Sequence, residues 1–272
     1  MTAPLNLAGV IGFPIAHSRS PRLHGFWLRR HGIDGHYVPL RIAPEDFSNA
    51  LKTLPKIGFS GANVTIPHKE AALALADHIT PLARRIGAAN TLSFTGRGIE
   101  ADNTDAHGFA ANILDSAPDW APRRVAVIGA GGASRAVLAA LQDRGATDIR
   151  IANRSFERAA RLAAEFGATA VAWEARETML DGCDTLVNAT SLGMTGQPPL
   201  PLRLDGLPKT AIVNDLIYTP LETSLLAAAR ARGNPVVDGL GMLLHQAAPG
   251  FERWFGVAPR VDQELRDWVL GA

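Results

Sequence analysis

The chain has 272 residues, of which 47% are hydrophobic and 19% charged, so it can bury the core of one large or two medium domains and is too apolar for a disordered chain. Its 27 Lys and Arg residues nearly balance 26 Asp and Glu residues, and no block of like charge marks a nucleic-acid surface or a polybasic membrane patch. Cys183 is the single cysteine, which excludes an internal disulfide and a secreted disulfide scaffold.

The N-terminus has no basic residue ahead of its first apolar stretch, and no apolar run approaches the roughly 20 residues that cross a bilayer. We therefore expect a cytoplasmic protein whose partners are small molecules, with no nucleic acid and no membrane among them.

The first hundred residues alternate short apolar runs with amphipathic stretches, a rhythm typical of βαβ units around a mostly parallel sheet. Ser20 and Pro21 predict a helix N-cap followed by proline at the first helical position, and Gly32 predicts the end of that helix. Pro67 is expected to end a strand. The expected strands are residues 7–13, 36–42 and 61–66, and the expected helices are residues 21–31, 44–54 and 71–77.

A second domain is predicted after a connecting helix that lies between Asp102 and Pro122. The Pro- and Asp-containing loop at residues 118–122 is typical of a link between domains. Beyond it we expect a βαβ unit, with strands at residues 124–128 and 148–152 around a helix at residues 134–142. Further parallel strands are expected at residues 185–187, 211–214 and 235–237, and helices at residues 242–251 and 262–270 should return to the first domain.

A glycine-rich segment, Gly129 to Ala133, follows a predicted strand and opens a helix, which is the context of a dinucleotide-binding loop. Glycine lets the backbone approach a pyrophosphate, and a helix N-terminus offers it free N–H groups. Ser134 stands where a third glycine is common, and its small side chain should still allow close helix packing. An ordinary glycine turn is the alternative.

The end of the second strand of this unit indicates which dinucleotide binds. An NAD-binding unit carries an Asp or Glu about 20 residues after the glycines, to accept a hydrogen bond from the ribose. Here Asn153, Arg154 and Ser155 occupy that region, with Arg158 close behind. Guanidinium groups match phosphate oxygens, so the pattern predicts NADP, although a solvated basic corner is the alternative.

Three polar clusters predict a site for an anionic substrate. Ser18 and Ser20 precede a helix N-terminus, where hydroxyl and N–H donors favour an anion, unless Ser20 is only a cap. Asn63 and Thr65 share one face of a strand, with Lys69 just past its end, where ligands bind in open α/β sheets. Asp105 belongs to a polar cluster at the expected domain junction, unless it too is only a helix cap.

In chain order, the segments SRSP, NVTIPHK, AANTL, DNTD, GAGGASR, NRSFER, NATSLGM and DGLGMLLHQ give the chain a resemblance to the shikimate dehydrogenase family over essentially its whole length. The resemblance implies an α/β protein with a substrate-binding domain (residues 1–106 and 240–272), a Rossmann-like NADP domain (residues 107–239), and a substrate cleft where the two meet. It also implies reduction of 3-dehydroshikimate by NADPH, in aromatic amino-acid biosynthesis, without a metal. The chain is expected to act as a monomer or homodimer.

Carried over position by position, the resemblance assigns roles to single residues. Lys69 and Asp105 match the catalytic pair. The substrate would contact Ser18, Ser20, Asn63, Thr65, Asn90, Tyr218 and Gln246. The cofactor would contact Gly129, Ala130, Gly131, Gly132, Ala133, Asn153, Arg154, Ser155 and Arg158, with Thr190, Leu216, Gly239 and Met242 along its nicotinamide half.

Two other functions fit part of the pattern. A quinate/shikimate dehydrogenase with broader substrate use or a preference for NAD is disfavoured by Arg154 and by Ser20, where similar quinate-using enzymes often have threonine. A non-catalytic binding or sensing protein is disfavoured because it would not need both Lys69 and Asp105.

Overall fold

The chain builds two separate six-stranded sheets, one in each of the two units into which it divides. In the computed structural model, which describes residues 6–271, unit 1 comprises the residues up to Thr104 and those from Leu244 onward, and unit 2 is Asp105–Leu243. The expected boundaries differ from these by two residues (106 against 104) and four residues (239 against 243).

The sheet of unit 1 is mixed and mostly parallel. Its strand order is β2-β1-β3-β5-β6-β4, and β5 alone runs antiparallel to its neighbours β3 and β6. The carboxyl ends of the parallel strands β1, β2 and β3 therefore lie on the same side of the sheet. The strands are β1 (Asn6–Gly12), β2 (Gly35–Arg41), β3 (Phe59–Val64), β4 (His78–Ile79), β5 (Thr91–Thr95) and β6 (Gly98–Asp102).

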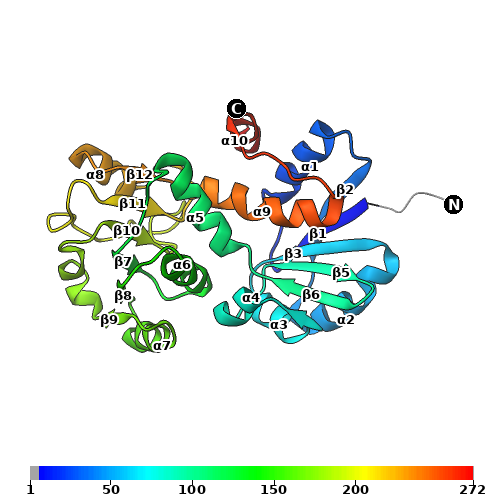
Figure 1. Ribbon diagram of the computed structural model, residues 1–272, viewed down its shortest axis with the longest axis horizontal. Coiled ribbons are helices and arrows are strands. Elements are labelled where there is room, and N and C mark those ends of the chain that lie inside the picture. The colour runs from blue at the N-terminus through cyan, green and yellow to red at the C-terminus, as the bar shows by residue number, and fades with distance from the viewer. Residues whose placement is uncertain (1–5, 272) are drawn as a thin grey trace. The chain divides into compact units, whose positions relative to one another are not determined.

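Helices cover both faces of this sheet (Figure 1). On one face α1 packs against α9, with the rings of Trp27 and Phe251 5.2 Å apart, and against α10. On the other face Phe47 and Leu51 join the core that also includes Ala72. The helices are α1 (Ser20–Arg30), α2 (Phe47–Thr53), α3 (Lys69–Ala74), α4 (Pro81–Ile86), α9 (Leu240–Phe255) and α10 (Gln263–Leu270), with 3-10 turns at Pro44–Asp46 and Leu54–Ile57.

The sheet of unit 2 is parallel throughout, in the order β12-β11-β10-β7-β8-β9. The chain runs from β7 outward to β9, then returns to β10 and runs outward the other way. The point of reversal, between β7 and β10, is where open α/β sheets bind ligands. The strands are β7 (Arg124–Ile128), β8 (Asp148–Ala152), β9 (Thr169–Val171), β10 (Thr185–Asn188), β11 (Ile212–Asp215) and β12 (Val236–Val237).

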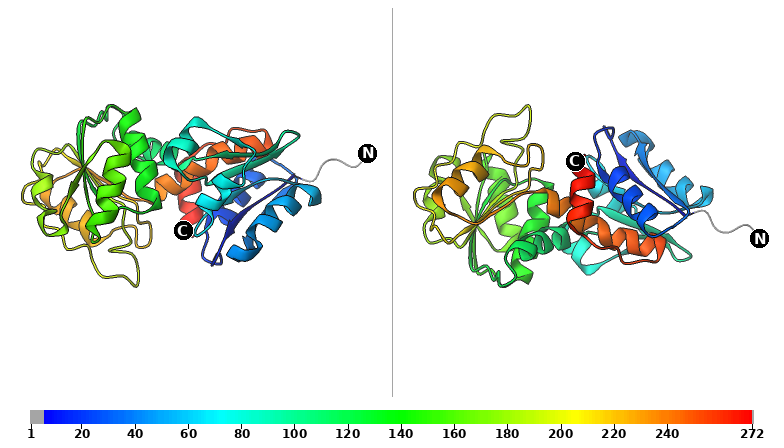
Figure 2. Two further views of the ribbon diagram at one scale, coloured as in Figure 1. Left: turned by 90° about the horizontal axis from the view of Figure 1, so that it is seen from below. Right: turned by 90° about the horizontal axis from the view of Figure 1, so that it is seen from above.

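Helices α6 (green) and α8 (amber) lie on opposite faces of this sheet (Figure 2). This is the arrangement expected when right-handed crossovers run in opposite directions along the sheet. The helices of unit 2 are α5 (Asp105–Ser116), α6 (Gly132–Asp143), α7 (Phe156–Phe166) and α8 (Ser224–Arg232), with 3-10 turns at Trp173–Ala175 and Thr178–Leu180.

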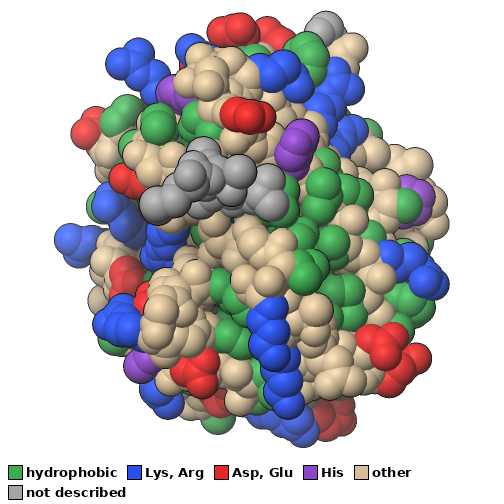
Figure 3. Space-filling view, turned by 90° about the vertical axis from the view of Figure 1, so that its right-hand side faces the viewer, with side chains coloured by type: hydrophobic (Ala, Val, Ile, Leu, Met, Phe, Trp, Pro, Cys, Tyr) green, Lys and Arg blue, Asp and Glu red, His purple; other side chains and the backbone are tan. Residues whose placement is uncertain are grey.

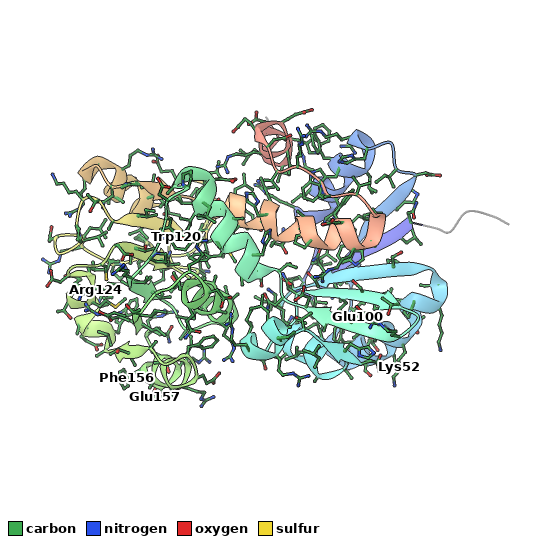
Figure 4. All side chains as sticks on the ribbon, in the orientation of Figure 1. Lys52, Glu100, Trp120, Arg124, Phe156 and Glu157 are labelled. Carbon is green, nitrogen blue, oxygen red and sulfur yellow. The ribbon has the colours of Figure 1, made fainter. Side chains whose placement is uncertain are left out.

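The loop at residues 118–122 is not the link between the units, so that expectation was wrong. Helix α5 and the loop both belong to unit 2, which begins at Asp105. Trp120 in this loop (labelled in Figure 4) packs edge-on against Phe109, and its indole N–H donates to the Thr185 hydroxyl at 3.1 Å. Proline and aspartate thus mark a turn that packs on its own domain.

Acidic and basic side chains are interspersed on the face shown in Figure 3, and neither sign forms a continuous field there. Within residues 6–271, no helix has both the length and the apolar character to cross a membrane.

Candidate active site

One candidate site is a pocket of about 220 Å³ at the carboxyl ends of β7, β8 and β10 in unit 2. Gly129 follows β7 with a φ of +113°, which side chains other than glycine rarely adopt. A Cβ there would also lie 2.9 Å from the backbone of Ala189 and from the methyl of Thr190. Glycine at this position therefore lets the loops after β7 and β10 pack together.

Gly131 and Gly132 differ from Gly129, because a Cβ on either would meet open space. Both are exposed at the start of α6, where the first backbone N–H groups lack acceptors within the helix. Ser134 is fully buried, and its hydroxyl accepts the N–H of Gly131 at 3.2 Å, so close helix packing survives without a third glycine. The open space beside these glycines fits a pyrophosphate.

Asn153, Arg154 and Arg158 line the same pocket, beyond the end of β8. No Asp or Glu is among the described residues that line it. Two cationic side chains and no ribose-reading carboxylate fit the 2′-phosphate of NADP.

Ser155 is occupied in another way. Its hydroxyl caps α7 by accepting the N–H of Arg158 at 3.4 Å and donates to Glu157 at 2.8 Å. Phe156 and Glu157 form the first turn of this helix (Figure 4). The residue does not line the pocket, so its side chain serves the helix in this structure.

Of the four residues expected along the nicotinamide half, Thr190 lines the pocket, whereas Leu216, Gly239 and Met242 do not. Leu216 and Gly239 lie together, because the N–H of Gly239 donates to Ile217 at 3.0 Å and a Cβ on Gly239 would collide with the backbone of Leu216. Met242 is half-buried in the first turn of α9. Gly132 and Ala133 of the glycine loop also lie outside the pocket lining.

A second candidate site, in unit 1, is a buried network of polar side chains. The Asn63 amide donates to the Asn90 carbonyl and the Thr91 hydroxyl, both at 3.2 Å. The Asn90 amide donates to Thr104 at 3.0 Å and to Gln246 at 3.2 Å. Three predicted substrate residues, Asn63, Asn90 and Gln246, are thereby brought together from β3, the segment before β5, and α9.

The same network fixes the backbone that leads into Asp105. The side-chain oxygen of Asn90, Oδ1, accepts the N–H of Thr104 at 2.7 Å. The side-chain amide of Asn103 donates to the Ala88 carbonyl at 2.9 Å. Asp105 itself is buried and is the first residue of α5. The two asparagines therefore hold the chain one and two residues ahead of a predicted catalytic carboxylate.

Ser20 is not the N-cap of α1, so that interpretation was wrong. It is the first residue of the helix, and its N–H donates to the Ser18 hydroxyl at 3.3 Å. Ser18 therefore makes the capping contact that was expected of Ser20. The Ser20 side chain is buried.

Tyr37 on β2 connects Ser20 to the network, a role that no sequence motif indicated. Its hydroxyl donates to Asn63 Oδ1 at 2.7 Å. Burial raises the pKa of this hydroxyl, and a hydrogen bond with Ser20 opposes the shift. The phenol thus stays protonated and lies beside two predicted substrate residues.

Thr65 and Lys69 both follow the carboxyl end of β3, Thr65 directly and Lys69 at the start of α3. Thr65 is half-buried, its N–H donates to Ile11 at 2.9 Å, and its methyl packs near Gly12. Lys69 is half-buried at the first position of α3, and its carbonyl accepts the N–H of Ala89 at 2.9 Å. Tyr218 lies apart from these residues in the chain, half-buried on the loop after β11 in unit 2.

The strand order of unit 2 and its glycine-lined, acid-free pocket define a Rossmann-type dinucleotide-binding protein. Family models match three parts of the chain: a shikimate dehydrogenase substrate binding domain at residues 10–92, shikimate/quinate 5-dehydrogenase at residues 110–194, and a shikimate 5′-dehydrogenase C-terminal domain at residues 239–263.

Whole-chain comparisons agree. The shikimate dehydrogenase (NADP(+)) of Paramagnetospirillum magneticum is 59% identical over 99% of this chain and 100% of its own length. The enzyme of the same name from Paracoccus denitrificans is 60% identical, over 97% of this chain and 95% of its own length. The chain belongs to the shikimate dehydrogenase family.

Two solved structures bear on ligand chemistry. Shikimate 5-dehydrogenase from Thermus thermophilus, in complex with NADP(H) and shikimate, is 37% identical with a TM-score of 0.88, covering 97% of this chain and 98% of that one. Quinate dehydrogenase from Corynebacterium glutamicum, in complex with NAD, is 31% identical with a TM-score of 0.92, covering 99% and 100%. The fold is thus shared by enzymes of both substrate and cofactor types.

Proposed function

We propose that this chain is a shikimate dehydrogenase, which reversibly reduces 3-dehydroshikimate to shikimate with NADPH. The observation that carries the choice of cofactor is the pocket beyond β8, where Arg154 and Arg158 lie and none of the described lining residues is acidic. An NAD-specific unit would place a carboxylate there. The relatives named above support the same cofactor and substrate.

Two domain roles follow in this proposal. Unit 2 holds NADP, with the glycine loop on the pyrophosphate and Arg154 and Arg158 on the adenosine 2′-phosphate. Unit 1 holds the substrate through its buried polar network and the two serines near the start of α1. The functional domains proposed from the sequence, residues 1–106 with 240–272 and residues 107–239, have boundaries within four residues of those of the two units.

In the substrate half, Ser18 and Ser20 bind the carboxylate, while Thr65, Asn90 and Gln246 bind ring hydroxyls or the reacting carbonyl. Asn63 and Tyr218 line the site. The network supports this assignment because it fixes amide orientations before substrate arrives: a buried amide with both ends bonded cannot turn freely.

On the cofactor side, the proposal keeps Gly129 to Ala133, Asn153 to Ser155, and Arg158 around the phosphates. Thr190, Leu216, Gly239 and Met242 are assigned to the nicotinamide half. When NADPH is bound, it supplies the hydride that is added to the carbonyl carbon of the substrate.

Side chains of the protein must supply and remove the proton of the reaction. Hydride addition leaves negative charge on the carbonyl oxygen, which becomes a hydroxyl once it takes up a proton. Lys69 donates this proton in the direction of reduction and takes it back in the direction of oxidation, with Asp105 as its carboxylate partner. The buried network excludes water from the amides around the substrate, so that their hydrogen bonds are not competed for.

The enzyme is proposed to act in the cytoplasm, as a monomer or homodimer, on this small-molecule substrate. A quinate/shikimate dehydrogenase is the second candidate, favoured by the likeness to the Corynebacterium glutamicum enzyme. One assay separates them: initial rates of shikimate and quinate oxidation, each with NADP and with NAD. Shikimate with NADP should give the largest kcat/KM. A larger value with quinate or with NAD would reject the proposal.

A further inference from the structure

Asp215, at the carboxyl end of β11, is a fully buried acid that neither the cofactor nor the substrate assignment uses. Its Oδ1 accepts the Asn188 amide at 3.0 Å and the Ile217 N–H at 3.1 Å, and its Oδ2 accepts the Thr223 hydroxyl at 2.7 Å. Burial raises the pKa of this carboxyl, and the hydrogen bonds from Thr223, Ile217 and Asn188 oppose that shift. A buried carboxylate held by three donors is costly to place and rigid once placed.

Asn188 is the matching residue of the neighbouring strand, directly opposite Asp215 in the register of β10 and β11, and it too is fully buried. The NH₂ end of the amide faces Asp215, because it donates to Oδ1 and a carboxyl oxygen is an acceptor. The carbonyl end of Asn188 must then face the loop after β10.

That orientation determines how Thr190 is held. Asn188 Oδ1 accepts the Thr190 hydroxyl at 2.7 Å and the Thr190 N–H at 3.1 Å. The Thr190 hydroxyl in turn accepts the Leu192 N–H at 3.0 Å, and the NH₂ of Asn188 also donates to the Leu192 carbonyl at 3.2 Å. Thr190 and Leu192 both line the dinucleotide pocket.

The Oδ1 atom of Asp215 also holds the loop after β11. The bond to the Ile217 N–H turns the chain just past Leu216, whose own N–H donates to the Asn188 carbonyl at 3.0 Å. The Ile217 carbonyl accepts the N–H of Gly239. One carboxylate therefore connects the loops that carry Thr190, Leu216 and Gly239, which are three of the four residues assigned to the nicotinamide half.

We propose that Asp215 is a positioning residue for the nicotinamide half of the cofactor, acting through Asn188 and the loops after β10 and β11. This inference rests on the proposed function for the location of the nicotinamide. The adenosine half lies on Arg154 and Arg158, after β8, and none of the hydrogen bonds of Asp215 reaches that loop. Thr190 and Leu192 line the same pocket as these arginines, but Leu216 and Gly239 do not. Loss of Asp215 should therefore weaken binding of the nicotinamide half much more than binding of the adenosine 2′-phosphate.

The test compares binding of NADP with binding of adenosine 2′,5′-bisphosphate, which contains the adenosine 2′-phosphate and lacks the nicotinamide. Dissociation constants are measured by calorimetry for the wild type and Asp215→Ala. We expect about a tenfold or greater rise for NADP, as for loss of one charge-assisted hydrogen bond, and a change of less than about twofold for the bisphosphate. Equal weakening of both ligands, or of neither, would overturn the inference.

Asn234→Ala is the matched control. Asn234 is also buried in unit 2, and its amide donates to the Pro208 and Ala211 carbonyls at 2.8 and 2.9 Å. These carbonyls precede β11, so they lie at the amino-terminal ends of the strands, away from the pocket. This variant should lose a similar amount of thermal stability and keep both dissociation constants. If it weakens NADP as Asp215→Ala does, general destabilisation explains the result and positioning is rejected.

Two further variants keep the test decisive if Asp215→Ala does not fold. Asp215→Asn retains an acceptor for Asn188 and Ile217 and should bind NADP nearly as the wild type does. A defect as large as that expected for alanine would show that these hydrogen bonds are not sufficient and would count against the inference. Thr223→Val removes the hydroxyl at Oδ2 and leaves the shape, and should weaken NADP severalfold with no change for the bisphosphate. Unchanged NADP binding in Thr223→Val would count against the inference.

The two proposals fail in different ways. A wild type that binds NADP but does not oxidise shikimate would reject the proposed function, while the binding comparison would still report on Asp215. A wild type that oxidises shikimate with an Asp215→Ala variant that binds NADP normally would reject only the positioning role.

Discussion

The imidazole of His24 lies flat against the phenol of Tyr37, with ring centroids 3.8 Å apart and planes 2° apart. His24 is fully buried on α1, and neither ring nitrogen has a hydrogen bond of normal geometry. Burial lowers the pKa of His24 to about 3, although the nearby Asn63 amide opposes the shift. The ring is therefore neutral in the folded protein above about pH 3.

The first prediction is that His24 makes the fold sensitive to acid. The unfolded chain binds a proton on His24 below about pH 6.5, and the folded chain does so only below about pH 3. Stability is therefore lost as the pH falls through this window, by about 1.4 kcal/mol per pH unit. Urea unfolding at several pH values should show His24→Phe losing less stability between pH 6.5 and 5 than the wild type. Parallel curves for the two proteins would contradict the assignment.

A second prediction concerns Tyr37, whose hydroxyl fixes the Asn63 amide. Tyr37→Phe removes this hydrogen bond and keeps the stacking on His24. A net value of about 0.5 to 1.5 kcal/mol for one hydrogen bond corresponds to a roughly two- to tenfold rise in the KM for shikimate. Steady-state kinetics should show little change in the KM for NADP. If both Michaelis constants stay at wild-type values, Tyr37 has a packing role only.

A third prediction concerns the carboxylate of the substrate. Ser20→Ala removes a buried hydroxyl near the start of α1 and should raise the KM for shikimate far more than that for NADP. Ser18→Ala should do the same and also destabilise the helix, because it loses the contact with the Ser20 N–H. The measurement is the pair of Michaelis constants together with Tm. Equal effects on the two ligands would count against carboxylate binding.

Cofactor choice gives a fourth prediction. Arg154→Ala should raise the KM for NADP about tenfold or more, because a charge-assisted hydrogen bond contributes about 1.5 to 3 kcal/mol, and should leave the KM for NAD nearly unchanged. Arg161→Ala removes a charge from the exposed side of α7 outside the pocket and serves as the control. Similar NADP constants for the two variants would show that general charge, not a phosphate contact, is responsible.

The fifth prediction is that Lys69 and Asp105 act as one proton-transfer unit. Lys69→Ala should reduce kcat by about 10² to 10⁴, the usual range for a general acid-base group, with little change in NADP binding. Asp105→Asn should also reduce kcat sharply. The double variant should be much less impaired than the product of the two single losses, as rapid-mixing and steady-state rates can show. Strictly multiplicative losses would mean that the two residues have separate tasks.

The part of the fold that could be predicted from sequence is the part with strong local signals. The strand at Asp148–Ala152 matches its expected bounds, and the glycine loop after β7 lies where the pattern placed it. Buried parallel strands are apolar runs, and glycine marks the turn between strand and helix, so both signals are local.

Elements without such signals were missed. Strands β5 and β6 form a hairpin with many polar residues, paired from Thr91 with Asp102 to Thr95 with Gly98. Half of such a strand faces solvent, so its composition resembles a loop. Helix α4 has six residues and β4 has two, which is too short for any periodic pattern to show.

The candidate site residues were proposed from motifs in the sequence, whereas the side chains that hold them in place could not be proposed in that way. Tyr37, Thr104 and Asp215 contact their partners through strand register and through loops distant in the chain. Nothing in the local sequence around Asp215 distinguishes it from a solvated aspartate at a strand end. Its role depends on Asn188 lying opposite in the next strand, which only the fold supplies.

Unit 1 takes its first strand from the beginning of the described chain and its last helices from the end, with the whole of unit 2 between them. The indole N–H of Trp254 donates to the Leu92 carbonyl at 3.0 Å, and the ring occupies the space where Gly61 lacks a Cβ. Unit 2 is one continuous segment, Asp105–Leu243, and domains generally fold as units, so it can fold while the sheet of unit 1 still lacks α9. The polar network of unit 1 is complete only when Gln246 reaches Asn90, so formation of the nucleotide-binding unit does not depend on completion of the substrate-binding unit.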